Sequence, residues 1–234
     1  MKKRSRRSLH ILITAGPTRE YLDSIRYISN PSSGKMGYAL ARAAAQRGHR
    51  VTLVSGPVNL PEPSGVKTIQ VETGEEMLRA SKNAFTTADA AIFAAAVCDY
   101  RPAIRTSRKA PKLKRLKINL VATKDIAATL GRSKGKQITI AFALEDHNGR
   151  SKAEAKLHAK RADAIILNSP ANIGRAHARV DFLARGDKWN RWPMGTKRAI
   201  SSRIVTYVEE ANQRRHRPNA PALEYAMTRR RSDR

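Results

Sequence analysis

Six short apolar runs, interspersed with helical patterns, constrain the fold of this chain most strongly. The runs cover Leu9–Thr14, Val51–Val54, Val66–Val71, Ala90–Val97, Ile138–Leu144 and Ala164–Leu167. The helical patterns cover Met36–Arg47, Thr73–Phe85, Asp125–Leu130, Ser151–Arg161 and Thr196–Gln213. Strands that alternate with helices predict an α/β domain with a doubly wound, mostly parallel sheet. Two later runs, 179–184 and 189–192, flank Arg185-Gly186-Asp187 and predict a C-terminal antiparallel hairpin.

The charge of the chain is strongly positive and unevenly spread. The 46 Lys and Arg residues exceed the 19 Asp and Glu residues by 27, which favours anionic partners such as nucleic acids or phosphorylated metabolites. Basic clusters at the two ends predict a basic tail at 1–8 and a basic disordered tail at 214–234, around a folded domain at 9–213. We expect these tails to aid solubility or to contact RNA non-specifically. The middle cluster, from Arg105 to Lys117, contains no acidic residue and requires an anionic ligand or a solvated loop.

Several protein classes are excluded by composition. The single cysteine, Cys98, rules out an intrachain disulfide framework, and a reducing cytoplasm is the expected location. No apolar run approaches the roughly 18 residues of a membrane helix. The basic N-terminus is followed by too short an apolar stretch for a signal peptide. The sequence therefore excludes a secreted disulfide scaffold and a membrane span.

The connection from the first strand to the first helix is unusually long. It runs for 18 residues, from Ala15 to Ser32, where such loops usually have about 2–6. It departs from a Rossmann dinucleotide site, in which G-x-G-x-x-G follows the strand at once. Its polar content predicts a ligand site at the carboxyl edge of the sheet, although a short helix at Tyr21–Tyr27 is an alternative. Ser32 or Ser33 is expected to cap the following helix, where Gly34 and Gly37 allow an anion close to the backbone.

Other strand ends are expected to meet at the same edge. Asp99 and Tyr100 follow the fourth strand, Glu145 the fifth and Asn168 the sixth. Lys and Arg residues at this edge would bind the phosphates of a ligand. Asp99 would form a hydrogen bond with a ring of that ligand, and Phe142 would pack against the ring. Each residue also has a plain structural alternative: Asp99 as a helix cap, Phe142 as core, and Lys112 as solvated surface.

No nucleophilic or metal-binding constellation is present. The sequence lacks H-E-x-x-H, C-x-x-C and G-x-S-x-G. The six histidines show no ligand spacing, and His49 is expected at the surface. The neighbouring Asp99 should raise the pKa of Cys98, which argues against a nucleophile. The expected chemistry is the positioning and charge stabilisation of phosphorylated substrates.

Five motifs, in this order, resemble the phosphopantothenoylcysteine synthetase family, the phosphopantothenate–cysteine ligases of coenzyme A synthesis. They are Ile13-Thr-Ala-Gly-Pro-Thr-Arg-Glu20, Asn30-Pro-Ser-Ser-Gly-Lys-Met-Gly37, Ala95-Ala-Val-Cys-Asp-Tyr-Arg-Pro102, Lys112-Leu-Lys-Arg115 and Phe142-Ala-Leu-Glu145. The resemblance extends from about Leu9 to Asn212 and implies a Rossmann-like fold and a homodimer. The bacterial type uses CTP with Mg²⁺: 4'-phosphopantothenate forms an acyl-cytidylate, and cysteine then displaces CMP.

The resemblance also implies residue roles. Asn30 and Lys112 are the implied catalytic residues, since Asn30 aids the attack by cysteine and Lys112 meets the triphosphate. Ala95 and Ala96 lie with Asn30 on the phosphopantothenate side. The implied nucleotide-binding residues are Gly16, Ser33, Gly34, Lys35, Gly37, Asp99, Lys114, Asp125 and Phe142. No flavin is expected in this chain, and a separate phosphopantothenoylcysteine decarboxylase would act on the product.

The sequence departs from the family pattern in several places. Cys98 replaces a usual alanine, Thr123-Lys-Asp-Ile126 replaces N-P-D-I, and Asn168-Ser-Pro replaces N-D. Because the spacing after Tyr100 differs, Lys109 is an alternative to Lys112. The preference for CTP over ATP stays open.

Two other functions are alternatives to the ligase function that the resemblance implies. An NAD(P)- or flavin-dependent oxidoreductase would share the fold, but the glycine motif is missing. A basic nucleic-acid-binding protein on a degenerate Rossmann-like fold would explain the charge, but aromatic residues are only 5% of the chain.

Overall fold

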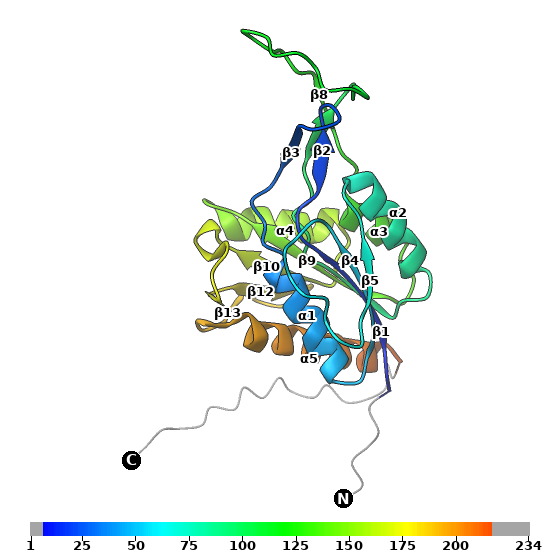
Figure 1. Ribbon diagram of the computed structural model, residues 1–234. Coiled ribbons are helices and arrows are strands. Elements are labelled where there is room, and N and C mark those ends of the chain that lie inside the picture. Colours follow the sequence, from blue (N-terminus) through cyan, green and yellow to red (C-terminus); the bar gives the residue numbers. More distant parts are fainter. Residues whose placement is uncertain (1–6, 217–234) are drawn as a thin grey trace, which may run out of the picture.

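The central sheet has the strand order β13-β12-β10-β9-β6-β1-β4-β5 in the computed structural model, which describes residues 7–216 (Figure 1). The parallel strands are β1 (His10–Ala15), β4 (Arg50–Ser55), β5 (Lys67–Gln70), β6 (Ala90–Phe93), β9 (Ile138–Leu144) and β10 (Ala164–Asn168). β12 (Asp181–Ala184) and β13 (Asn190–Arg191) continue the sheet as an antiparallel hairpin. The parallel part thus has the 3-2-1-4-5-6 order of a Rossmann sheet, with the switch point between β1 and β6. The predicted fold class is confirmed, including the C-terminal hairpin.

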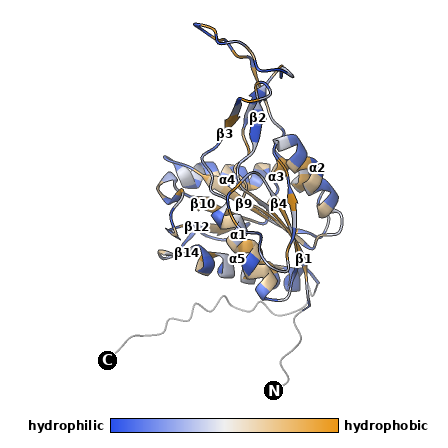
Figure 2. Cartoon of the chain, viewed as in Figure 1, coloured by the Kyte–Doolittle hydropathy of each residue, from blue (hydrophilic) through white to orange (hydrophobic). Residues whose placement is uncertain are grey.

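Helices cover both faces of this sheet. α1 (Lys35–Gln46) and α5 (Lys197–His216) lie on one face, and α2 (Gly74–Phe85), α3 (Ile126–Ser133) and α4 (Gly149–Ala159) lie on the other. The alternation along β1 explains how both layers are held. Ile11 and Ile13 join the core under α1 and α5, whereas Leu12 joins the core under α2 and α3. Figure 2 shows this as hydrophobic strands between helices with hydrophilic outer faces.

Local sequence signals set several of the helix ends. The T-x-x-E spacing at Thr73 forms a capping box, in which Thr73 and Glu76 each accept from the other's backbone N–H. Asp125 caps α3 by accepting from the Ala128 N–H at 2.9 Å. The one short 3₁₀ turn among the described residues, Pro170–Asn172, follows β10 and leads towards β11 (His177–Ala178), which pairs with β14 (Gly195–Thr196).

Four expectations from the sequence need correction. The strand predicted at Ala90–Val97 ends at Phe93. Beyond it, Ala96 forms backbone hydrogen bonds with Gly16 and Thr18, which follow β1. The alternative helix at Tyr21–Tyr27 is instead a hairpin of β2 (Arg19–Tyr21) and β3 (Tyr27–Ser29). α5 continues to His216, past the domain boundary expected at 213. The basic tails otherwise fall mostly outside the described residues.

His49 is the fourth case. The sequence predicts it at the surface, but its side chain is buried, with only 5% of the residue exposed. Its Nε2 lies 2.9 Å from the Glu209 carboxylate of α5, and its Nδ1 accepts from the Leu9 N–H. Arg47 donates to the same carboxylate from the end of α1. This buried group ties α1 to α5, and position after a helix-ending glycine does not reveal such a long-range partner.

Two hairpins project from the carboxyl edge of the sheet and form an arm (Figure 1). The first is β2–β3, and the second is β7 (Tyr100–Pro102) paired with β8 (Leu120–Ala122). The arm is defined as residues 19–29 and 100–122. Of the helices that the structure describes, none is long and apolar enough to cross a membrane.

Candidate active site

The candidate site lies where β1 and β6 end, at the switch point of the sheet. Gly16 follows β1 with φ +74°, and a Cβ there would lie 2.9 Å from the Gly56 carbonyl oxygen. Gly37, in the first turn of α1, comes so close to β1 that a Cβ would lie 2.4 Å from the Ala15 Cβ. Both glycines allow backbones to approach closely at this edge. Open α/β sheets bind ligands at this place.

Asn30 reaches the end of β6 from the other side of the long connection. Its side-chain Nδ2 donates to the carbonyl oxygens of Ala96 at 3.2 Å and Val97 at 3.1 Å. Because both amide hydrogens face these acceptors, Oδ1 is the atom that remains to bond a ligand. The structure therefore brings Asn30 together with Ala95 and Ala96, which are half-buried.

The start of α1 lies beside this group and has free donors. Gly34 takes the cap position with φ +69° and no side-chain cap, so neither serine is the helix cap that the sequence predicts. Ser32 Oγ instead accepts from the Gly34 N–H at 3.4 Å. Within the described chain, the N–H groups of residues 35–37 donate to no partner. Three unused donors at a helix N-terminus favour an anion at this point.

Two lysines add positive charge near these donors. Lys35 Nζ donates to the Gly174 carbonyl oxygen at 3.2 Å. Burial, and then the charge of Lys35, lower the pKa of Lys197 at the start of α5. No sequence signal marks Lys197, because only the packing of α5 beside α1 brings it close to Lys35.

The residues after β6 connect the site to the arm. Cys98 is buried, and its thiol donates to the Thr18 carbonyl oxygen at 3.5 Å. Burial is the largest cause that raises the pKa of Cys98, with Asp99 a smaller one, so the expected direction is confirmed. Thr123 Oγ1 donates to the Cys98 carbonyl oxygen at 2.5 Å, and the Thr123 N–H donates to that of Asp99. Asp99 itself is exposed at the edge.

Asp125 and Phe142 lie on the neighbouring elements. The Asp125 carboxylate caps α3 and forms an ion pair with Lys160, the residue that follows α4. Burial favours a higher pKa for Asp125, but the Ala128 N–H and the Lys160 ammonium outweigh it and lower the pKa. Phe142 is half-buried on β9. Asn168, at the end of β10, accepts from Asn172 Nδ2 at 2.6 Å.

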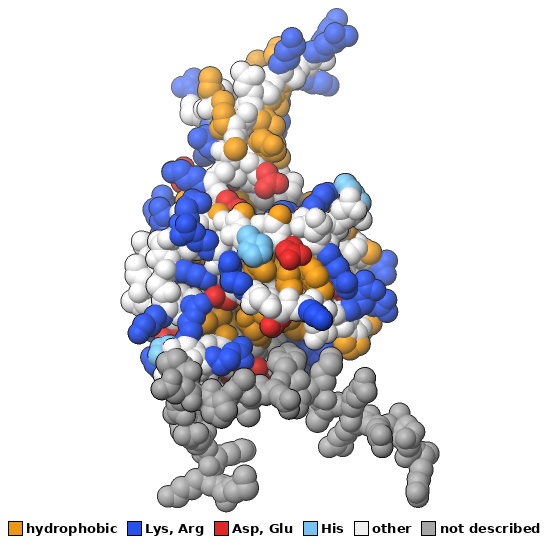
Figure 3. Space-filling view, turned by 180° about the vertical axis from the view of Figure 1, so that it is seen from behind, with side chains coloured by type: hydrophobic (Ala, Val, Ile, Leu, Met, Phe, Trp, Pro, Cys, Tyr) orange, Lys and Arg blue, Asp and Glu red, His pale blue; other side chains and the backbone are white. Residues whose placement is uncertain are grey.

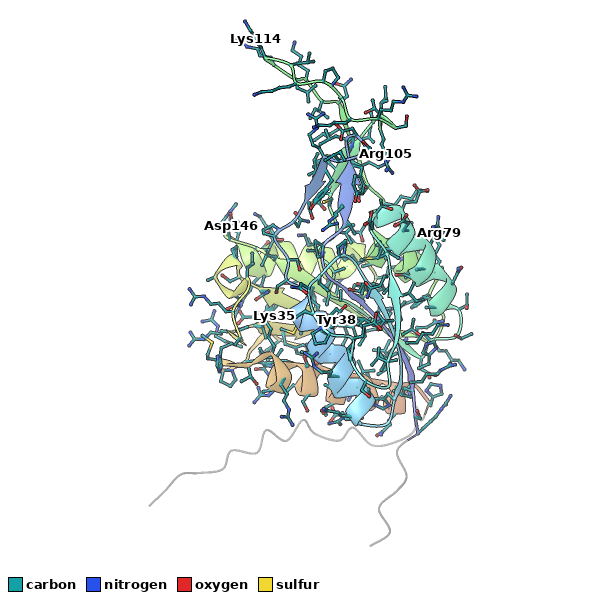
Figure 4. The ribbon with its side chains drawn as sticks, in the orientation of Figure 1. Lys35, Tyr38, Arg79, Arg105, Lys114 and Asp146 are labelled. Atoms are coloured by element: carbon teal, nitrogen blue, oxygen red, sulfur yellow. The ribbon has the colours of Figure 1, made fainter. Side chains whose placement is uncertain are left out.

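Lys112 and Lys114 lie apart from this group within one chain. Figure 4 shows Lys114 at the tip of the arm, well away from Lys35 in the body. Lys112 belongs to the same exposed loop, and Lys109 lies just before it. The structure thus brings Asn30, Ala95, Ala96, Gly34 and Lys35 to one edge but leaves the predicted triphosphate lysines on the arm.

Comparison with known proteins identifies the family of the chain. Residues 7–211 match the model of the DNA/pantothenate metabolism flavoprotein C-terminal domain. The chain belongs to this family. It is 44% identical over 220 residues to the coenzyme A biosynthesis bifunctional protein CoaBC of Escherichia coli, covering 88% of this chain and 54% of that protein. It is 41% identical to CoaBC of Vibrio cholerae, covering 86% of this chain and 52% of that protein. The chain thus spans about half the length of these relatives.

Solved structures agree with the family assignment. The chain matches a crystal structure of the C-terminal domain of the coenzyme A biosynthesis bifunctional protein CoaBC with TM-score 0.77 and 38% identity. That match covers 88% of this chain and 96% of the other. A Cab2 mutant complex with phosphopantothenate-cysteine has TM-score 0.73 at 16% identity, covers 89% of this chain and 87% of that one, and shows a shared fold.

Proposed function

We propose that this chain joins 4'-phosphopantothenate to L-cysteine in coenzyme A biosynthesis, as a ligase that uses CTP. The single observation that carries the proposal is the placement of Asn30. Its amide is fixed by Ala96 and Val97 beside the uncapped start of α1. This edge offers free N–H donors for an anion and one oriented carbonyl oxygen for an amine.

In the first half-reaction, a carboxylate oxygen of phosphopantothenate attacks the α-phosphorus of CTP, and pyrophosphate leaves. Catalysis here requires that the negative charge be held in place rather than that a protein nucleophile react. The free N–H groups of residues 35–37 and the ammonium of Lys35 are suited to phosphate oxygens. We assign the other phosphate contacts to Lys112 and Lys114, with Lys109 as the alternative to Lys112. Because these lysines lie on the arm, away from Lys35 of the same chain, this assignment requires the arm of a second copy to bring them to the phosphates.

In the second half-reaction, the cysteine amine attacks the acyl carbon, CMP leaves with the bonding electrons, and the nitrogen loses a proton. Asn30 Oδ1 faces away from its two backbone acceptors and can accept a hydrogen bond from the amine. That bond would orient the lone pair of the nitrogen towards the acyl carbon.

The nucleotide base is assigned to the surface between β6 and α3. Asp99 is exposed there, and its backbone is fixed by Thr123. Gly16, Ser33, Asp125 and Phe142 complete the proposed nucleotide contacts. Asp125 is already engaged with Ala128 and Lys160, so its role would be to hold the start of α3 beside the base.

Mg²⁺ is proposed to enter the site bound to the nucleotide substrate. Among the residues that the structure describes, no group of three or more His, Cys, Asp or Glu side chains could hold a metal ion. The proposal needs no such group, because the triphosphate itself supplies oxygen ligands, which Mg²⁺ prefers.

The working enzyme is proposed to be a homodimer. The arm exposes large apolar side chains, namely Ile25, Tyr27, Tyr100, Ile104, Leu113, Leu116, Ile118, Leu120 and Val121. Figure 3 shows such side chains together with Lys and Arg on the projecting part. Exposed apolar surface of this kind favours a protein–protein contact. A second copy packed on the arm would cover it.

Release of pyrophosphate by the purified protein tests the proposal. The reaction would contain Mg²⁺, 4'-phosphopantothenate, cysteine and either CTP or ATP, and each component would be omitted in turn. We expect release that requires phosphopantothenate and is faster with CTP. Folded protein that releases no pyrophosphate with either nucleotide would contradict the proposal.

A further inference from the structure

The tip of the β2–β3 hairpin contains an ion pair between a buried carboxylate, Asp23, and a partly exposed guanidinium, Arg26. Asp23 is only 1% exposed. Its Oδ1 accepts from the N–H groups of Ile25 and Arg26, both at 2.8 Å, which closes the hairpin turn. Its Oδ2 accepts from the Arg26 guanidinium through Nε at 2.8 Å and Nη2 at 2.5 Å.

The same ion pair holds one residue of the second hairpin from both sides. Asp23 Oδ2 also accepts from the Ala110 N–H at 3.2 Å, and Arg26 Nη2 donates to the Ala110 carbonyl oxygen at 2.7 Å. We call Asp23, Arg26 and Ala110 the arm clamp. The N–H groups of Ile25 and Arg26, and then the Arg26 side chain, hold the pKa of Asp23 far below its ordinary range. The same contacts therefore favour the charged carboxylate.

Further contacts join the two hairpins below the clamp. The Thr106 N–H donates to the Leu22 carbonyl oxygen at 3.1 Å, and the Arg105 guanidinium lies 4.8 Å from the centre of the Tyr21 ring. After Ala110, towards the tip of the arm, such contacts end. In the part of the chain that the structure describes, residues 111–118 take part in no hydrogen bond or ion pair.

Ala110 is therefore the last residue before the basic segment 111–118 that hydrogen bonds hold to the β2–β3 hairpin. We propose that Asp23 and Arg26 are positioning residues that fix the root of the loop at Ala110 and so set where Lys112 and Lys114 meet the nucleotide phosphates. The inference rests on the proposed function for the phosphate contact, but the anchoring itself does not. Charge-assisted hydrogen bonds are stronger than neutral ones, so the bonds between the buried Asp23 carboxylate, Arg26 and Ala110 can hold the root of the loop in place.

Asp23→Asn separates the clamp from the hairpin turn. Asparagine keeps Oδ1 for the two turn N–H groups but places an NH₂ group where Oδ2 accepts from Arg26 and Ala110. Asp187→Asn is the matched control, because Asp187 is exposed in the β12–β13 turn and its side chain makes no hydrogen bond in the described chain.

Limited trypsin digestion with mass spectrometry tests whether the clamp holds the loop at Ala110, and it does not depend on enzymatic activity. In the natural chain we expect early cleavage after Lys112, Lys114 and Arg115, and slow cleavage after Arg105, Arg108 and Lys109. In Asp23→Asn the slow sites should be cleaved about tenfold faster, since local opening governs such cleavage. Asp187→Asn should keep the natural pattern. An unchanged pattern in Asp23→Asn would overturn the clamp.

A nucleotide-binding measurement tests whether the clamp positions Lys112 and Lys114. Calorimetry with Mg-CTP should give a Kd about fivefold or more higher for Asp23→Asn, while the KM for cysteine stays within about twofold. A changed trypsin pattern with an unchanged CTP Kd would overturn the positioning role. If the natural chain binds no CTP and has no ligase activity, the proposed function fails, whereas the trypsin pattern still decides whether the clamp exists.

Discussion

Contacts distant in sequence decide what individual residues of the site can do. The resemblance to known ligases selects Asn30, but it does not show which atom of the amide is available. That depends on the Ala96 and Val97 carbonyls, which lie 66 and 67 residues away. His49 shows the same limit, because its partner Glu209 lies 160 residues away. The sequence nominates Asn30, whereas the orientation of its amide could not be predicted from the sequence.

His10 gives a prediction at this scale. Its ring is buried between the Thr87 carbonyl and the Thr52 hydroxyl, and burial, followed by Arg50 and Lys67, lowers its pKa from 6.5. The unfolded chain therefore binds the proton more readily, and stability should fall as the pH drops below about 6.5, by up to about 1.4 kcal/mol per pH unit. Urea unfolding from pH 7.5 to 5 would measure this, and His10→Gln should show a flatter dependence. Identical pH profiles would contradict it.

Elements were predicted well where local signals were strong. The parallel strands, the capping box at Thr73 and the late hairpin all follow from periodicity, spacing and turn residues. The β2–β3 hairpin was not predicted, because its strands are only three residues long and bury little surface. The arm clamp was also missed, since it joins positions 23 and 110.

Gly37→Ala tests how tightly α1 must pack on β1. The added Cβ would lie 2.4 Å from the Ala15 Cβ, so the helix must shift away from the strand. We expect a loss of about 1–3 kcal/mol in the free energy of unfolding, typical of overpacking. Gly135→Ala is the control, because its nearest neighbour would lie 3.7 Å away. Equal stability of the two variants in urea would contradict the tight packing.

The molecule as a whole combines a complete Rossmann-like body with an arm whose apolar side chains face outwards. If a second copy covers the arm, sedimentation should give twice the chain mass of 25.9 kDa. Ile104 is 81% exposed on the arm, so Ile104→Asp should shift the protein towards a monomer. Met194→Asp, exposed outside the arm, should stay dimeric. A natural chain that sediments as a monomer would contradict the dimer.

The most direct test of the ligase proposal combines the pyrophosphate assay with product analysis of the natural chain and Asn30→Ala. With Mg-CTP, phosphopantothenate and cysteine, the natural chain should yield the phosphopantothenoylcysteine amide, CMP and pyrophosphate. Asn30→Ala should still form the acyl-cytidylate but lose about 10²-fold or more of the amide rate, because the amine is no longer oriented. Equal amide formation by both proteins would contradict the role of Asn30. No amide from the folded natural chain would contradict the ligase itself.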